Sequence, residues 1–150
     1  MCMGLKMEEL RKAAERGDAR AQLKLGTAYS LGYNFTGEHC EDVPRNAAKG
    51  VKWHRKAAEQ GHAEAQHYVG NAYHTGEGVA KNTAKAVEWW TRAAEQGYAE
   101  AQYNLGCVYY HGEGVERNVD KAVEWWTKAM ERGSYCAAFP LRGGPSREKK

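Results

Sequence analysis

An internal repeat with a period of 36 residues constrains this chain more than any other feature, because it fixes the size and number of the building blocks. The segment from Ala57, AAEQGHAEAQHYVGNAYHTGEGVAKNTAKAVEWWTR, matches the segment from Ala93, AAEQGYAEAQYNLGCVYYHGEGVERNVDKAVEWWTK, at most positions. An earlier copy starts at Ala13 and carries eight additional residues, 33–40 (YNFTGEHC). Three full repeats are therefore expected over residues 19–133.

Each repeat is predicted to form two helices joined by a short turn. Glycines such as Gly76 are expected to end the first helix, because glycine readily adopts the left-handed conformation of helix C-termini. An asparagine precedes each second helix, at Asn46, Asn82 and Asn118, where its side chain would cap the helix. The predicted fold class is all-α, with stacked helix-turn-helix units, since one amphipathic hairpin cannot bury its own apolar face.

The two ends of the chain depart from this repeat. Residues 1–18 match the second helix of a preceding unit, so an N-terminal half-repeat is expected there. Residues 134–141 lack the AQ..LG signature and contain Pro140, which predicts a divergent C-terminal cap. Residues 142–150 are rich in Lys and Arg and are expected to form a flexible basic tail.

The paired tryptophans of the KAVEWW segments, Trp89–Trp90 and Trp125–Trp126, pose the choice between a binding platform and a core. On a helix, both indoles of a pair fall on one wide apolar face together with alanines, which let neighbouring helices approach. The first repeat has Trp53 at the same place, followed by His54. The tryptophans are therefore interpreted as framework.

Composition and charge limit the classes of function. Charged residues make up 27% and hydrophobic residues 42%, which is typical of globular proteins. The net charge of +3 comes from the last ten residues, because the other 140 carry 18 basic and 18 acidic side chains. A nucleic-acid-binding protein normally has a basic face on the fold itself. A nucleic-acid-binding helical repeat is therefore kept only as an alternative.

Motifs of catalysis and metal binding are weak. Residues 146–149 match an S-x-x-K string, but they lie in the predicted tail without the partner motifs of penicillin-interacting enzymes. His67, His74 and Cys107 lie on first helices, yet their spacing matches no zinc motif. The chain is therefore predicted to be non-catalytic, with no cofactor and no metal.

The motif AEAQ..LG..Y..G.GV..N..KAVEW...AAEQG, which runs through residues 13–133, resembles the Sel-1-like repeat family, relatives of the tetratricopeptide repeats. The resemblance implies a right-handed superhelix whose first helices line a concave wall. It also implies a scaffold that binds a peptide or a partner protein on that wall. Some cysteine-rich relatives were linked to β-lactam binding, so a penicillin-binding or β-lactamase-like activity is a further alternative.

The binding surface is predicted on the face of each first helix that lies opposite its core face. Framework positions agree between repeats because stacking demands it, whereas these positions differ and include aromatic and hydrogen-bonding side chains. Asn71 also matches the place where tetratricopeptide proteins hold a terminal carboxylate, although the neighbouring lysine is absent. The predicted partner-binding residues are Thr27, Ser30, His67, Asn71, His74, Tyr103 and Tyr110.

The insertion at residues 33–40 is a second candidate contact site, with a merely tolerated loop as the alternative. Its Asn34-Phe35-Thr36 sequence also matches a glycosylation sequon.

The four cysteines, Cys2, Cys40, Cys107 and Cys136, are predicted to be free thiols. Cysteine-rich relatives staple each hairpin at positions that are alanines in this chain, such as Ala58 and Ala65. No signal peptide is recognised, so a cytoplasmic location is expected, or a periplasmic or secreted one if a signal was removed.

Overall fold

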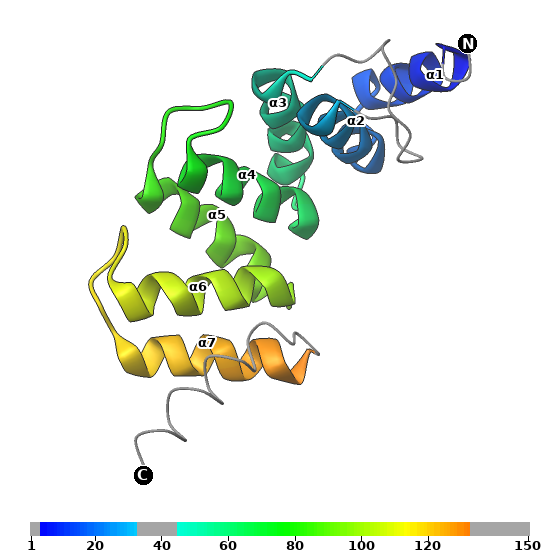
Figure 1. Ribbon diagram of the computed structural model, residues 1–150. Coiled ribbons are helices and arrows are strands. Elements are labelled where there is room, and N and C mark those ends of the chain that lie inside the picture. Colours follow the sequence, from blue (N-terminus) through cyan, green and yellow to red (C-terminus); the bar gives the residue numbers. More distant parts are fainter. Residues whose placement is uncertain (1–3, 33–44, 133–150) are drawn as a thin grey trace. The chain divides into compact units, whose positions relative to one another are not determined.

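The structure is a computed structural model that describes residues 4–32 and 45–132. In this part of the chain every regular element is a helix (Figure 1). The helices are α1 (Gly4–Glu15), α2 (Ala19–Leu31), α3 (Ala47–Glu59), α4 (Ala63–Thr75), α5 (Thr83–Glu95), α6 (Ala99–His111) and α7 (Val119–Glu131). The predicted all-α fold with two helices per repeat is confirmed. The insertion, the C-terminal cap, the basic tail, Cys2, Cys40 and Cys136 lie outside the described residues.

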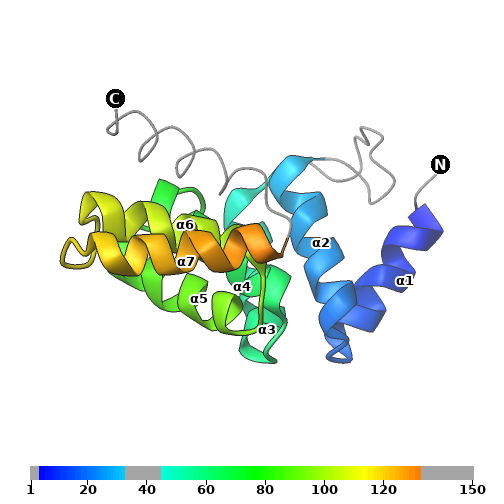
Figure 2. The same cartoon turned by 90° about the horizontal axis from the view of Figure 1, so that it is seen from below.

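The helices fall into two compact units, an N-terminal unit with α1–α4 up to Lys81 and a C-terminal unit with α5–α7 from Asn82 on. In the N-terminal unit α3 packs against both α2 and α4, and in the C-terminal unit α6 packs against both α5 and α7. Figures 1 and 2 show α6 and α7 lying side by side. A middle helix therefore has neighbours on two of its sides.

The capping residues set the helix boundaries as the sequence predicts. Asn46, Asn82 and Asn118 each accept a hydrogen bond from the backbone N–H three residues further on, at 3.0 or 3.1 Å. This bond satisfies one of the N–H groups that a helix leaves free at its start. The first helix of each repeat ends at a left-handed glycine with φ of 73° or 79°.

A buried glutamine ties each first helix to the helix before it. The side-chain N–H groups of Gln22, Gln66 and Gln102 donate to main-chain carbonyls near the end of the preceding helix, at 2.9 to 3.1 Å. A buried amide without such a partner would cost on the order of 1–3 kcal/mol. The glutamine of the AEAQ motif is therefore a framework residue.

The tryptophans differ in burial, and Trp89, the first of its pair, is buried together with Trp90. Trp90 and Trp126, the second of each pair, are buried in the core. Trp53 and Trp125, which stand at the position of Trp89 in the first and third repeats, are half-buried, and the ammonium groups of Lys56 and Lys128 lie 4.5 and 4.6 Å from their ring centroids. The interpretation of the tryptophans as framework is confirmed for the buried ones.

The second helices of the first and third repeats, α3 and α7, each place an aromatic ring against a glycine of the first helix. A Cβ atom added to Gly106 would collide with the indole of Trp126, and one added to Gly26 would collide with the imidazole of His54. The glycine of the LG pair therefore makes room for the ring at this one position of the second helix. In the first repeat that ring is a histidine.

The second glycine of the GEG turn brings one repeat close to the preceding one. Gly78 has φ of 80°, and a Cβ atom there would lie 2.6 Å from the carbonyl oxygen of Ala47 at the start of α3. Gly61 has a similar φ of 93°, but a Cβ atom there would meet nothing within 4 Å. Both glycines have a positive φ, but only Gly78 packs closely against another helix. Substitutions at the two positions therefore distinguish the cost of backbone strain from the cost of a steric clash.

We expect Gly61→Ala to lower the free energy of unfolding by about 1–2 kcal/mol, because alanine resists a positive φ. Gly78→Ala should cost a further ~1–3 kcal/mol, because its methyl group also meets the backbone of α3. Urea unfolding of the two variants beside the parent protein measures the difference. Equal costs for the two substitutions would show that the turn does not pack tightly on α3.

Candidate functional site

The N-terminal unit contains an open hollow of about 410 Å³ between α2 and α4. The helix α3 forms its floor, and the turn after α4 forms one end. The lining combines apolar and polar side chains. It consists of Thr27, Ser30, Leu31, Ala47, Val51, His54, Tyr68, Asn71, Ala72, Thr75 and Glu77.

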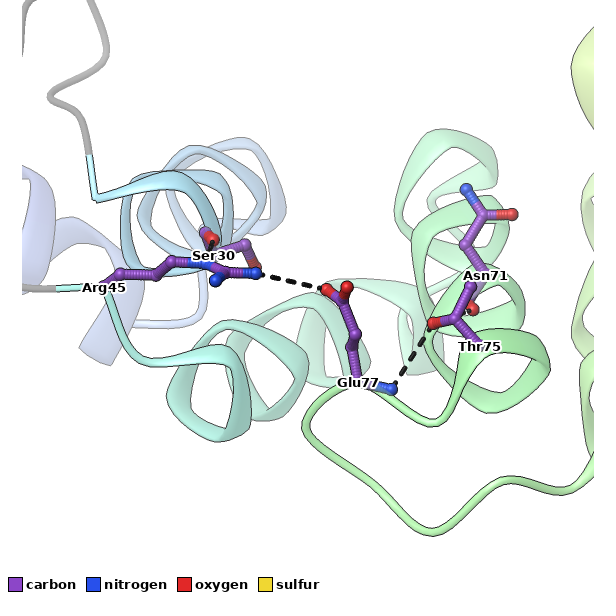
Figure 3. A network of polar contacts seen from close by, with 5 residues as sticks. All are labelled: Ser30, Arg45, Asn71, Thr75 and Glu77. Carbon is purple, nitrogen blue, oxygen red and sulfur yellow. Dashed lines mark hydrogen bonds and ion pairs between the residues drawn. The ribbon is translucent and has the colours of Figure 1, made fainter.

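A chain of polar contacts surrounds one end of this hollow (Figure 3). The guanidinium of Arg45 donates through Nε to the carbonyl oxygen of Ser30 at 3.0 Å and lies 3.4 Å from the carboxylate of Glu77. On the other side, the Glu77 N–H lies 3.4 Å from the Thr75 hydroxyl, which donates to the carbonyl oxygen of Asn71 at 3.0 Å. These contacts join the end of α2 to the end of α4.

The Arg45–Glu77 ion pair is exposed, so it contributes at most about 1 kcal/mol to stability. The pair holds two opposite charges beside the hollow. A ligand in the hollow would therefore meet both a donor and an acceptor at this end.

His54 lies in the floor of the hollow and is only 5% exposed. Its Nε2 atom lies 3.2 Å from the hydroxyl oxygen of Thr27, and its ring stacks on Tyr68 with centroids 4.9 Å apart. Burial lowers the pKa of His54 from 6.5 to about 4, although a hydrogen bond to the backbone of Leu23 opposes this. The imidazole is therefore neutral at pH 7, and the floor of the hollow carries no charge.

The structure gathers three of the predicted binding residues in one place. Thr27 and Ser30 of α2 and Asn71 of α4 all line the hollow. They come from the first helices of successive repeats, as the prediction of a shared first-helix face requires. Each is partly buried, and each presents a hydroxyl or amide group.

Two of the predicted residues do not face away from the core as expected. His67 is 8% exposed and counts among the buried residues of α4. Tyr103 is half-buried and packs, with Cys107, against the core cluster of Ala122, Trp126 and Ala129. For Tyr103 the reason is geometric, since α6 packs against helices on two sides and buries a wider arc than one face of a helical wheel predicts.

The remaining predicted residues are more accessible. His74 is partly buried on α4. Tyr110 is 39% exposed, and its ring lies 5.5 Å from that of Trp126 within the C-terminal unit. Exposure of Tyr110 therefore agrees with the sequence-based expectation, while its ring is anchored on one side by the indole.

Several lining residues were missed by sequence reasoning, above all His54, Val51, Tyr68 and Glu77. The sequence does contain a signal for one of them, because His54 stands where the other repeats have Trp90 and Trp126. A residue that differs from the other repeats at a buried framework position indicates that the packing differs there, and His54 does line the hollow.

Metal and membrane sites find no support in the part of the chain that the structure describes. Residues 4–32 and 45–132 contain no group of three or more His, Cys, Asp or Glu side chains placed to hold a metal ion. No helix within these ranges is long and apolar enough to cross a membrane.

Cys107 forms no disulfide, and burial raises the pKa of its thiol. The prediction of free thiols is therefore confirmed for Cys107.

The capped helix pairs, the buried glutamines and the glycine turns define a helical-repeat protein of the tetratricopeptide-like class, built from hairpins of 36 residues. The Sel1 repeat model matches three times, at residues 19–62, 63–98 and 99–134. The chain belongs to the Sel1 repeat family. A comparison with curated proteins found no significant match.

Solved structures agree with this assignment. The chain is similar to a Sel1 repeat protein from Oxalobacter formigenes, with 34% identity and a TM-score of 0.78 over 91% of this chain and 97% of the other. It is also similar to c5321, a protective antigen of uropathogenic Escherichia coli, with 32% identity and a TM-score of 0.66 over 90% of this chain and 35% of that protein. Helicobacter pylori cysteine rich protein B, at 24% identity and a TM-score of 0.64 over 91% of this chain and 97% of the other, shares the fold.

Proposed function

We propose that this chain is a non-catalytic interaction module that binds a peptide segment of a partner protein through its first helices. The main contact lies in the hollow between α2 and α4. The observation that carries the proposal is that Thr27, Ser30 and Asn71, which differ between repeats, line one hollow together with apolar side chains. Sel1 repeats generally act as protein-interaction modules, which supports the same conclusion.

The chemistry of the hollow suits a peptide side chain. Binding sites combine an apolar lining with a few polar groups that fix orientation. Here Ala47, Val51 and Leu31 supply apolar surface, while hydroxyl groups and the Glu77 carboxylate lie at the rim. A peptide backbone crossing from α2 to α4 would place one side chain in the hollow and its N–H and C=O groups near this rim.

Filling the hollow should abolish this binding. We expect Ala47→Phe to weaken the affinity for a bound peptide by about tenfold or more, because the phenyl ring occupies space that the ligand needs. The matched control is Val119→Phe, which places the same ring at the same position of the third repeat, where the valine is exposed. Peptides selected from a displayed random library on the complete chain provide the ligands, and fluorescence polarisation measures the dissociation constants.

The control is expected to keep the affinity of the parent protein. Equal affinity in Ala47→Phe and the parent would show that the hollow is not the contact site. Loss of affinity in both variants would instead indicate a surface that extends beyond the N-terminal unit, and would contradict the assignment to this hollow.

A further inference from the structure

The first and third repeats differ at two positions, 30 and 54 in the first repeat, whose counterparts in the third repeat lie close together in space. By the internal repeat, Ser30 corresponds to Tyr110, and His54 corresponds to Trp126. Both residues of the first repeat line the hollow. The tyrosine and tryptophan of the third repeat are therefore replaced by two smaller and more polar side chains, a serine and a histidine, in the first.

The third repeat shows where the aromatic rings lie. The indole of Trp126 sits against Gly106, donates through Nε1 to the carbonyl oxygen of Tyr103 at 3.2 Å, and is 6% exposed. Its centroid lies 5.5 Å from the ring of Tyr110, with an angle of 39° between the two planes. Aromatic pairs at this separation attract each other beyond the effect of the area that they bury.

In the first repeat, the imidazole of His54 takes the place of only the five-membered part of the indole. It lies against Gly26, just as the pyrrole edge of Trp126 lies against Gly106. At positions 30 and 54 the first repeat has neither the six-membered ring of a tryptophan nor the phenol of a tyrosine, because Ser30 and His54 stand there. The side chain of Ser30 also turns toward Gly50, which stands where the other repeats have alanine, and so leaves the hollow open.

We propose that the hollow of the N-terminal unit is an aromatic-anchor site, in which a tryptophan, tyrosine or phenylalanine of the partner peptide takes the place of the rings that the first repeat lacks at positions 30 and 54. This inference rests on the proposed function and names its ligand class. His54 and Val51 form part of the floor, and Tyr68, whose ring stacks on that of His54, lines the hollow beside them. An indole N–H or a phenol O–H of the ligand finds hydrogen-bond acceptors in the Glu77 carboxylate and the Thr75 hydroxyl oxygen at the rim.

The neutral state of His54 supports this ligand class. A charged imidazolium in the floor would favour an anionic ligand, whereas a neutral ring stacked on a phenol offers an apolar, polarisable wall. The ion pair of Arg45 and Glu77 adds no net charge to the site. A terminal carboxylate therefore gains less from this hollow than an aromatic side chain does.

The test uses two small probes of similar size, N-acetyl-tryptophanamide and N-acetyl-cyclohexylalaninamide, titrated into the complete chain and followed by backbone amide NMR shifts. We expect the tryptophan probe to shift the amides of Val51, Asn71 and Thr75 and to bind about fivefold more tightly than the saturated probe. Ser30→Tyr, which restores the residue of the third repeat, should abolish these shifts. The reciprocal variant Tyr110→Ser is the matched control and should leave them unchanged.

Ala47→Phe fills the hollow from α3 instead of α2. It provides a second variant in which loss of the probe-induced shifts can be measured should Ser30→Tyr fail to fold. Equal binding of the two probes, or shifts that persist in both filled variants, would overturn the aromatic preference. Shifts of the same amides in Phe35→Ala without any probe would show that residues 33–44 of the chain itself occupy the hollow, and would overturn it as well. Selected peptides that lack aromatic residues yet lose affinity in Ala47→Phe would refute this inference while leaving the proposed function intact.

Discussion

Trp126→Ala is expected to lower the free energy of unfolding by about 3–5 kcal/mol, the range found when a buried tryptophan is truncated. The side chain is 6% exposed and lies between Gly106, Tyr103 and Tyr110 of α6. The substitution removes its hydrogen bond to the Tyr103 carbonyl group as well as its packing. Because Gly106 has no side chain, α6 offers nothing at that position to refill the space.

The neighbouring tryptophan provides the control for this prediction. Trp125 is half-buried, and its main partner is the ammonium group of Lys128, 4.6 Å from the ring centroid. An exposed cation–π contact contributes about 0.5–1 kcal/mol, so Trp125→Ala should cost far less. Urea unfolding followed by circular dichroism compares both variants with the parent protein. Similar costs for the two substitutions would mean that the indoles share the core equally, contrary to the structure.

The fold could be predicted from the sequence because each framework residue recurs with the repeat and has a local cause. Asn46, Asn82 and Asn118 cap helices through bonds within their own turns, and the glycines that end the first helices need no distant partner. Such local rules act in the same way in every copy. Agreement between copies therefore identifies the positions that hold the hairpins together.

The site was predicted only in part, because its residues depend on how neighbouring helices pack. Thr27, Ser30 and Asn71 were found by comparing first helices, and they do meet around the hollow. His67 was expected to face away from the core, but its side chain is buried. Tyr103 was misplaced because a helical wheel assigns one buried side to α6, which has neighbours on two. His54 was missed because its role depends on the space that its small ring leaves open. The third repeat, where Trp126 stands in its place and packs on Tyr110, shows how larger rings are arranged at these positions.

Acid is expected to destabilise the protein through His54 more than through an ordinary histidine. The pKa of His54 is lowered from 6.5 in the unfolded chain to about 4 in the folded one, because burial disfavours the charged imidazolium. Between these two values the unfolded state binds more protons, so stability falls as the pH is lowered. With 1.36 kcal/mol for each pKa unit, the loss between pH 7.5 and pH 4 amounts to about 3 kcal/mol.

The contribution of His54 is isolated by comparison with His54→Gln, which keeps a hydrogen-bonding group near Thr27 but does not titrate. The free energy of unfolding is measured in urea at pH 7.5 and pH 4 for both proteins. The parent should lose about 3 kcal/mol more than the variant over this interval, and the stability should be regained fully above pH 6.5. Because carboxylate titrations are common to both proteins, they cancel in the difference. Parallel losses in the two proteins would place His54 in contact with water in the folded state, which would also remove the neutral floor on which the aromatic-anchor site depends.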